Sequence, residues 1–139
     1  MKSKYSPLVK LKKKELDRVE RDLIRANNAF SAASTAVDDA YTLLSTLTLP
    51  ANGSVAELLQ SQSMIQAQHT EIQMCLDRRA FAKAQQLQIG RQFKASMMEY
   101  EKFKYLETQE IQAHMLKTKK EEAKMLDEIG VITYKSEPL

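Results

Sequence analysis

Residues that make turns are scarce in this chain. Its 139 residues include only three glycines and three prolines, and they include no tryptophan. A compact fold of many short elements needs more turns than this composition provides, so we expect few, long elements. A charged content of 28% suits long helix faces that lie in solvent.

Cysteine and long apolar runs are equally scarce. The single cysteine, Cys75, excludes a disulfide within the chain and fits a reducing compartment. No apolar run is long enough to span a bilayer, and no apolar core follows the basic N-terminus as a signal peptide requires. The sequence therefore predicts a soluble, cytoplasmic protein.

Candidate catalytic and metal-ligating residues form no recognisable site. The spacing of His69, Cys75 and His114 matches neither a zinc-ligand nor a nucleophile pattern. We interpret the first two as a histidine at the edge of a helix interface and a small packing thiol. Asp38 and Asp39 lack further carboxylates nearby, and the chain has no phosphate-binding glycine loop. We therefore expect no enzymatic activity, no metal and no cofactor.

The strongest pattern is a heptad repeat in the first third of the chain. Apolar residues recur from Leu16 to Leu47 at alternating steps of three and four residues. A sustained period of 3.5 residues predicts one strand of a left-handed coiled coil. The repeat consists of Leu16, Val19, Leu23, Ala26, Phe30, Ala33, Val37, Ala40, Leu44 and Leu47.

A second apolar stripe supplies the facing helix. It consists of Val55, Leu58, Ile65, Ile72 and Leu76, with Gln62 and His69 at the intervening positions. Beyond Leu76 an extra four-residue step resembles a stutter, and Gly90 weakens the helix. We expect looser pairing in that region.

Capping and turn signals set the bounds of the two helices. Ser6 before Pro7 predicts a helix start near residue 7, because proline is tolerated in the first helical turn. Residues 49–54 contain Leu-Pro and Asn-Gly, which favour a turn. Ser54 and Glu57 have the spacing of a capping box, and Gly130 stands where a C-terminal cap belongs. We therefore predict one all-α domain over 1–139: a helix at about 7–48, a turn at 49–54, a helix at about 55–129 and a tail at 130–139.

Two long helices joined by a short turn predict an antiparallel coiled-coil hairpin. At 1.5 Å per residue the helices span about 63 Å and about 112 Å, so the second must overhang. If residues whose numbers sum to about 103 face one another, Pro7 lies near Ser96. Such an uncovered helix gains little stability by itself, so we expect another protein to cover it. Its apolar residues are Met97, Met98, Tyr100, Phe103, Tyr105, Leu106, Ile111, Met115 and Leu116.

Charge is segregated along the chain. Residues 1–25 contain nine basic and four acidic side chains, whereas residues 26–77 contain five acidic side chains and neither lysine nor arginine. A hairpin of this sequence has a basic open end and an acidic tip, which can orient it in an electrostatic field.

Several stretches resemble the FliJ family of bacterial flagellar export proteins. They are the basic start Leu-Val-Lys-Leu-Lys-Lys-Lys-Glu-Leu at 8–16, the long heptad helix, the Asn-Gly-Ser turn at 52–54 and the late Lys-Lys-Glu-Glu-Ala-Lys-Met-Leu-Asp-Glu at 119–128. Members of this family are antiparallel two-helix coiled coils similar to the central stalk subunit of rotary ATPases. The resemblance implies a component of the flagellar type III export apparatus, which serves flagellum biogenesis and motility.

The resemblance also implies partners and a location. The partners are the hexameric flagellar export ATPase ring, the cytoplasmic domain of the export-gate membrane protein, and export chaperones. The location is cytoplasmic and peripheral, at the inner face of the cell membrane beside the flagellar basal body.

Candidate binding residues follow from the charge pattern and from the resemblance. The open end, which would sit in the ATPase ring, offers Lys10, Lys12, Lys13, Lys14, Arg18, Arg21, Met97, Tyr100 and Phe103. The family's gate-binding patch maps onto Tyr41, Met64, Gln68, Glu71 and Cys75. Gln68 and Glu71 depart from the more apolar patch of the family, so Tyr41 and Met64 are the stronger candidates.

Two other functions compete with this interpretation. A structural coiled coil could hide the overhang in a homodimer, which would make its mass depend on concentration. A basic coiled coil could bind nucleic acid, but here the basic residues are mixed with acidic ones and no aromatic stacking pattern is present. We therefore expect no nucleic acid among the partners.

Overall fold

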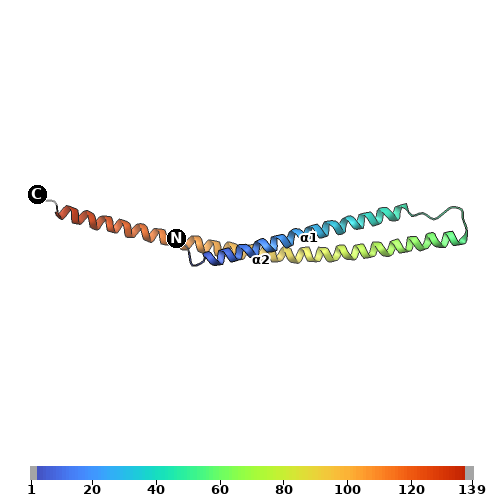
Figure 1. The fold of residues 1–139 in the computed structure, drawn as a ribbon, viewed down its shortest axis with the longest axis horizontal. Coiled ribbons are helices and arrows are strands. Elements are labelled where there is room, and N and C mark those ends of the chain that lie inside the picture. The colour runs from blue at the N-terminus through green and yellow to red at the C-terminus, as the bar shows by residue number, and fades with distance from the viewer. Residues whose placement is uncertain (1–2, 137–139) are drawn as a thin grey trace. The chain divides into compact units, whose positions relative to one another are not determined.

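Two long antiparallel helices make up almost all of the protein. The computed structural model describes residues 3–136, with side chains through residue 134. The helices are α1 (Ser6–Thr46) and α2 (Val55–Ser136), and the described residues contain no strand (Figure 1). The predicted all-α hairpin, with a longer second helix, is confirmed.

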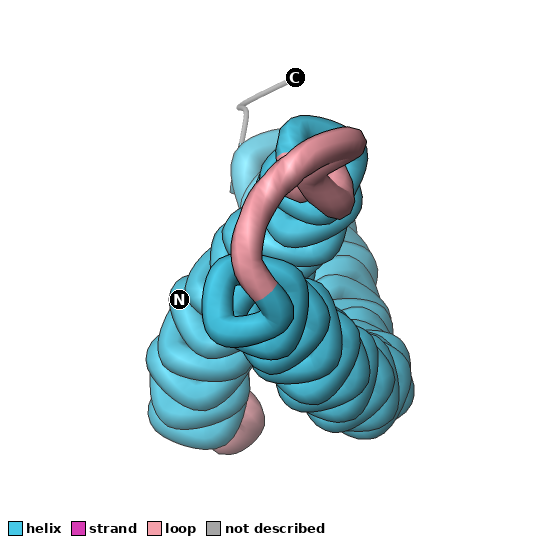
Figure 2. Tube along the Cα trace, turned by 90° about the vertical axis from the view of Figure 1, so that its right-hand side faces the viewer, coloured by secondary structure: helices cyan, strands magenta, loops and turns pink. Residues whose placement is uncertain are grey.

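The helix ends show how local chemistry sets the bounds. Pro50 follows α1, and the connection Leu47–Ser54, pink in Figure 2, separates the two helices. The Ser54 hydroxyl accepts a hydrogen bond from the Glu57 backbone N–H at 3.2 Å, as the capping pattern predicts. At the start of α1, the first helical bond runs from Val9 N to Tyr5 O, so Tyr5 rather than Ser6 is the cap residue.

Gly130 does not end the second helix. Only Gly53 among the described residues has a positive φ, so Gly130 does not adopt the left-handed conformation of a C-terminal cap. The helix continues through it to Ser136, and the predicted tail at 130–139 is helical as far as the structure describes it. A single glycine costs a helix only about 1 kcal/mol, which the flanking helical turns can absorb.

The chain divides into two compact units, which are described separately. The loop unit comprises residues 17–95, and the terminal unit comprises the described parts of residues 1–16 and 96–139.

The core of the loop unit is a seam between α1 and α2. Its most buried cluster consists of Val37 and Ala40 from α1 with Ile72 and Cys75 from α2, and Leu44 and Leu76 pack against it. The predicted seam residues Val19, Val37 and Ile72 are buried, whereas Leu23, Phe30 and Ile65 are half-buried. Leu58 is 38% exposed because α1 ends at Thr46 and no helix faces the first turns of α2.

The seam of α2 includes residues that the apolar stripe of the sequence left out. Gln68 and Cys75 are buried, whereas His69 is exposed. The Gln68 amide nitrogen donates a hydrogen bond to the Ala40 carbonyl at 2.8 Å, which satisfies a polar group inside the seam. The predicted intervening position at His69 is therefore wrong by one residue.

The seam continues without a stutter beyond Leu76. Positions at steps of three and four residues are half-buried throughout: Arg79, Ala82, Gln86, Ile89 and Phe93. Gln86 donates to the Asn27 side chain at 2.7 Å. The predicted stutter is wrong because polar residues occupy seam positions that an apolar pattern search passes over.

The terminal unit packs the start of α1 against α2. Val9 and Leu16 are buried, and the rings of Tyr5 and Phe103 lie 6.5 Å apart between centroids. The Lys4 backbone N–H donates to the Glu110 carboxylate at 3.3 Å. This contact brings a negative charge to the N-terminus of α1, where the helix dipole favours it.

The register of the pair differs from the predicted one. Pro7 lies beside Lys104, not near Ser96. The shift amounts to roughly two helical turns, and it arises because the connection Leu47–Ser54 is extended rather than a tight turn. Residues 97–110 therefore have a partner within the chain, and the overhang begins only after Ile111.

Candidate protein-binding surfaces

The first candidate surface is the basic surface of the terminal unit, formed by Lys10, Lys12, Lys13 and Lys14. The Lys12 ammonium lies 3.7 Å from the Glu15 carboxylate and 3.9 Å from that of Glu99. Ion pairs of this length at the surface contribute less than about 1 kcal/mol. A partner with acidic groups can therefore replace them at little cost.

Aromatic rings of α2 lie under these lysines. The Lys13 ammonium lies 5.6 Å from the centre of the Tyr100 ring, and that of Lys12 lies 5.9 Å from the centre of the Phe103 ring. Both rings are half-buried in the pair of helices. The ammonium groups of Lys13 and Lys12 thus lie over the rings of Tyr100 and Phe103. Met97 is 37% exposed and contributes part of its side chain to the surface.

The remaining predicted basic residues belong to the loop unit. Arg18 and Arg21 are exposed, and Arg18 lies 3.6 Å from the Asp22 carboxylate. Asp22 also pairs with Arg25 at 3.6 Å, so these charges form a local surface network.

The second candidate surface lies on the loop unit, where the predicted gate-binding residues divide into two groups. Tyr41 is 50% exposed, Met64 is 52% exposed, and Glu71 is exposed as well. Gln68 and Cys75 lie inside the seam, so neither offers its polar atoms to a partner while the helices are paired. The Cys75 thiol is 3.7 Å from the Glu71 carboxylate, which accepts its weak hydrogen bond.

The three exposed residues do not form one patch. With Val37 and Ile72 at heptad position a, Tyr41 occupies position e, whereas Met64 and Glu71 occupy position g. In an antiparallel pair the e positions of both helices flank one side of the seam and the g positions flank the other. Tyr41 therefore lies on the opposite flank from Met64 and Glu71.

Leu43 is a surface residue that the sequence pattern did not single out. It also occupies position g, and it is 52% exposed. Leu43 therefore lies on the same flank of the seam as Met64 and Glu71. The signal was available in the sequence, because Leu43 stands one residue before the seam residue Leu44.

The third candidate surface is the overhang, residues 112–134 of α2. In Figure 1 this part of the helix, orange to red, has no neighbouring segment among the described residues. All its described side chains except Thr118 are exposed. Six apolar residues fall within about 120° of arc at 100° per residue, and they define an apolar stripe. The stripe consists of Ile111, which precedes the overhang, and Met115, Met125, Leu126, Ile129 and Ile132.

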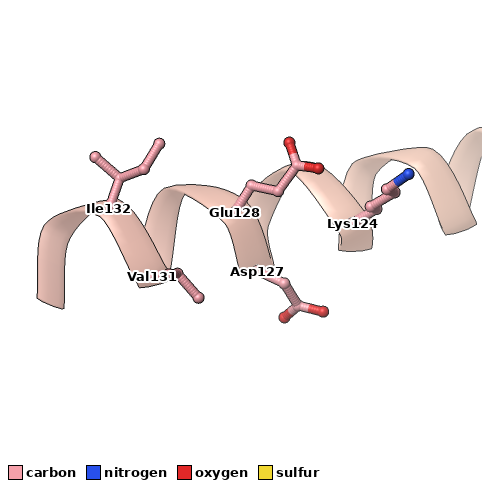
Figure 3. A pocket seen from close by; sticks show the side chains of 5 residues that line it. All are labelled: Lys124, Asp127, Glu128, Val131 and Ile132. Atoms are coloured by element: carbon pink, nitrogen blue, oxygen red, sulfur yellow. The ribbon is translucent and has the colours of Figure 1, made fainter. Parts of the chain in front are cut away.

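The opposite face of the overhang is charged. Figure 3 shows Glu128 and Ile132 projecting from one side of the helix, and Asp127 and Val131 from the other, with Lys124 one turn before Glu128. The sequence pattern pointed only to the first part of this stripe, through Met115. The later members repeat at three- and four-residue spacing and were therefore detectable in the sequence.

The described residues contain neither a candidate metal site nor a candidate membrane span. They contain no group of three or more histidine, cysteine or acidic residues that could hold a metal ion. Within the same part of the chain, neither helix has a segment long and apolar enough to cross a bilayer.

Comparison with known proteins identifies the family. A sequence model described as the flagellar FliJ protein matches residues 1–138. Neither the curated proteins nor the solved structures include a match to this chain. The family resemblance of the sequence is thereby confirmed. The chain belongs to the FliJ family of flagellar proteins, whose members are non-catalytic components of flagellar protein export.

Proposed function

We propose that this protein is a non-enzymatic coiled-coil stalk that binds the hexameric flagellar export ATPase and couples it to the export gate. Its terminal unit engages the ATPase ring, and its loop unit engages the cytoplasmic domain of the gate protein and export chaperones. The protein acts in the cytoplasm, peripherally at the inner face of the cell membrane.

The observation that carries this proposal is the separation of charge and apolar surface between the two units. The basic surface belongs to the terminal unit, whereas residues 26–77 of the loop unit contain neither lysine nor arginine. The loop unit instead exposes the apolar side chains of Leu43 and Met64 beside the carboxylate of Glu71. Two surfaces of different chemistry favour two different partners.

The ATPase contact is assigned to the basic surface of the terminal unit, and Arg18 and Arg21 of the loop unit are further candidate ATPase-binding residues. Lysine ammonium groups at an interface rim accelerate association with an acidic partner. Replacing these lysines by acidic residues weakens that association. The rings of Tyr100 and Phe103 contact the Lys13 and Lys12 ammonium groups, and Met97 adds exposed apolar area on the same helix.

The gate contact is assigned to the g flank of the loop unit, with Met64 and Glu71 as its exposed members. Leu43 adds apolar area to the same flank. Behind this flank, inside the seam, the Cys75 thiol donates a weak hydrogen bond to the Glu71 carboxylate, and Gln68 bonds to the Ala40 carbonyl. Tyr41 lies on the e flank and forms a separate contact there.

The ATPase contact is tested by binding of the purified chain to the purified export ATPase of the same organism. The variant in which Lys12, Lys13 and Lys14 become glutamate should bind at least about tenfold more weakly, which corresponds to about 1.4 kcal/mol. A matched control reverses three exposed cations of α2 in the loop unit, Arg78, Arg91 and Lys94, and should bind normally. Equal affinity of both variants and the natural chain would refute the basic surface as the ATPase contact.

A further inference from the structure

We propose that the overhang is also a self-association surface: two copies of this chain pair antiparallel through their apolar stripes. The proposal concerns the purified chain alone and goes beyond its binding to the export machinery. It rests on the shape of the stripe, on the charge distribution along the overhang and on the symmetry of the apolar spacing.

The shape of the stripe fits a helix. One shallow hollow is lined by Met115, Thr118, Lys119 and Glu122, together with His114. The next is lined by Glu122, Met125, Leu126 and Ile129. Each set of four stands at positions i, i+3, i+4 and i+7, an arrangement that every helix face offers, the charged face included, and that receives one side chain of a facing helix in knobs-into-holes packing.

The charge distribution favours a second copy in the opposite direction. Residues 112–120 contain three lysines and no acidic side chain, a net charge of +3. Residues 121–134 contain four acidic side chains and one lysine, a net charge of −3. Antiparallel pairing places the basic half of each copy against the acidic half of the other, whereas parallel pairing places like charges together.

The apolar spacing has the same symmetry. An antiparallel pair centred near residue 122 places Ile111 across from Ile132, and Met115 across from Ile129. Glu122 lies within the stripe near the centre, where it faces Glu122 of the other copy, and Lys119 stands about one helical turn away on each copy. The four outer members of the stripe therefore match in this register, whereas Met125 and Leu126 lie across from Lys119 and Thr118.

Dimerisation and any binding of another protein to the stripe exclude each other. A dimer would thus be the form of the free chain, and a partner that covers the stripe would compete with it. The basic surface belongs to the paired part of the terminal unit. It therefore lies outside the dimer contact.

Sedimentation velocity of the full chain over a wide concentration range tests the association. We expect the mass to rise from one chain to two as concentration increases. Ile129→Asp places a carboxylate in the stripe and should weaken association at least about tenfold. Val131→Asp on the charged face of the same helix is the matched control and should change it less than about threefold. A single-chain mass at every concentration, or equal effects of both variants, would overturn the proposal and leave the stripe to a different protein.

Cysteine cross-linking tests the direction of pairing. In a Cys75→Ser background, the variants Met115→Cys and Ile129→Cys are mixed and oxidised. Antiparallel pairing predicts a disulfide between the two different variants, because their α-carbons would lie within disulfide distance. Efficient cross-linking of Met115→Cys with itself, and none in the mixture, would contradict the antiparallel dimer.

Charge exchange provides a test that needs no change in the apolar stripe. The acidic variant converts Lys117, Lys119 and Lys120 to glutamate, and the basic variant converts Glu121, Asp127 and Glu128 to lysine. Each alone should remain a single chain, whereas an equimolar mixture should form a mixed dimer at low salt. Dimers of either variant alone with the affinity of the natural chain would refute the role of charge.

Discussion

Replacing Ile72 by alanine is the sharpest test of the seam. Ile72 is 5% exposed and lies in the cluster with Val37, Ala40 and Cys75. Truncation to alanine removes three buried carbon atoms and leaves a cavity unless the helices move together. Such a change costs 2–5 kcal/mol in protein cores in general.

The structure places the expected loss at the lower end of that range. A seam between only two helices opens to solvent on both flanks, so the helices can approach and water can reach the cavity. We therefore expect a loss of about 2–3 kcal/mol in the free energy of unfolding. In a chain of this size that loss lowers the melting temperature by roughly 6–12 °C.

Urea and thermal unfolding, both followed by circular dichroism, measure this loss. Met74→Ala is the matched control, because Met74 lies two residues away on the same helix and is 48% exposed. The control should lose less than about 1 kcal/mol. Equal losses for Ile72→Ala and Met74→Ala would refute the position of the seam.

Three further predictions concern individual contacts. Gln68→Leu should change the free energy of unfolding by less than about 1 kcal/mol, since the Ala40 carbonyl keeps its own helical hydrogen bond; a loss above about 2 kcal/mol in urea unfolding would contradict this. Lys12→Ala should cost less than about 1 kcal/mol, and a cost unchanged at 1 M salt would show that its ion pairs do not account for it. Met64→Asp should weaken binding to the gate domain while leaving helicity unchanged. The binding free energy lost through Tyr41→Asp should add to that lost through Met64→Asp, because the two residues lie on opposite flanks. Strong non-additivity would place them in one contact.

The sequence was sufficient to predict α1 and the hairpin. All seam positions of α1 from Leu16 to Leu47 are apolar, so the heptad is complete and each residue independently supports it. Pro50 and the Ser54 cap also act only on neighbouring residues. The helix ends near the turn could therefore be predicted from the sequence.

The seam of α2 was harder to predict for a physical reason. Gln68, Arg79 and Gln86 occupy seam positions, where long side chains can bury their stems and satisfy their polar ends at the edge. A search for apolar residues instead assigns Leu76 to the seam, with His69 at the intervening position. This assignment shifts the predicted stripe by one residue. The family resemblance separately placed Gln68 and Cys75 on a predicted binding surface, although the structure buries both.

The register depended on a property that residue patterns do not encode. The conformation of residues 47–54 sets how far α2 runs before it meets α1, and an extended connection moved the pairing by roughly two turns. For this reason Tyr100 and Phe103, expected in the overhang, are half-buried against α1, and the uncovered stripe lies nearer the C-terminus.

Secretion of flagellar proteins by living cells tests the central claim most directly. A strain that lacks this protein would be complemented with the natural chain, with the Lys12–Lys14 reversal, with Met64→Asp, and with the control reversal of Arg78, Arg91 and Lys94, and the secreted flagellar protein per cell would be measured. If the chain couples the ATPase to the gate, the first two variants should each reduce secretion severely while the control restores it. Full secretion with both variants, at equal cellular levels of the protein, would contradict the coupling role.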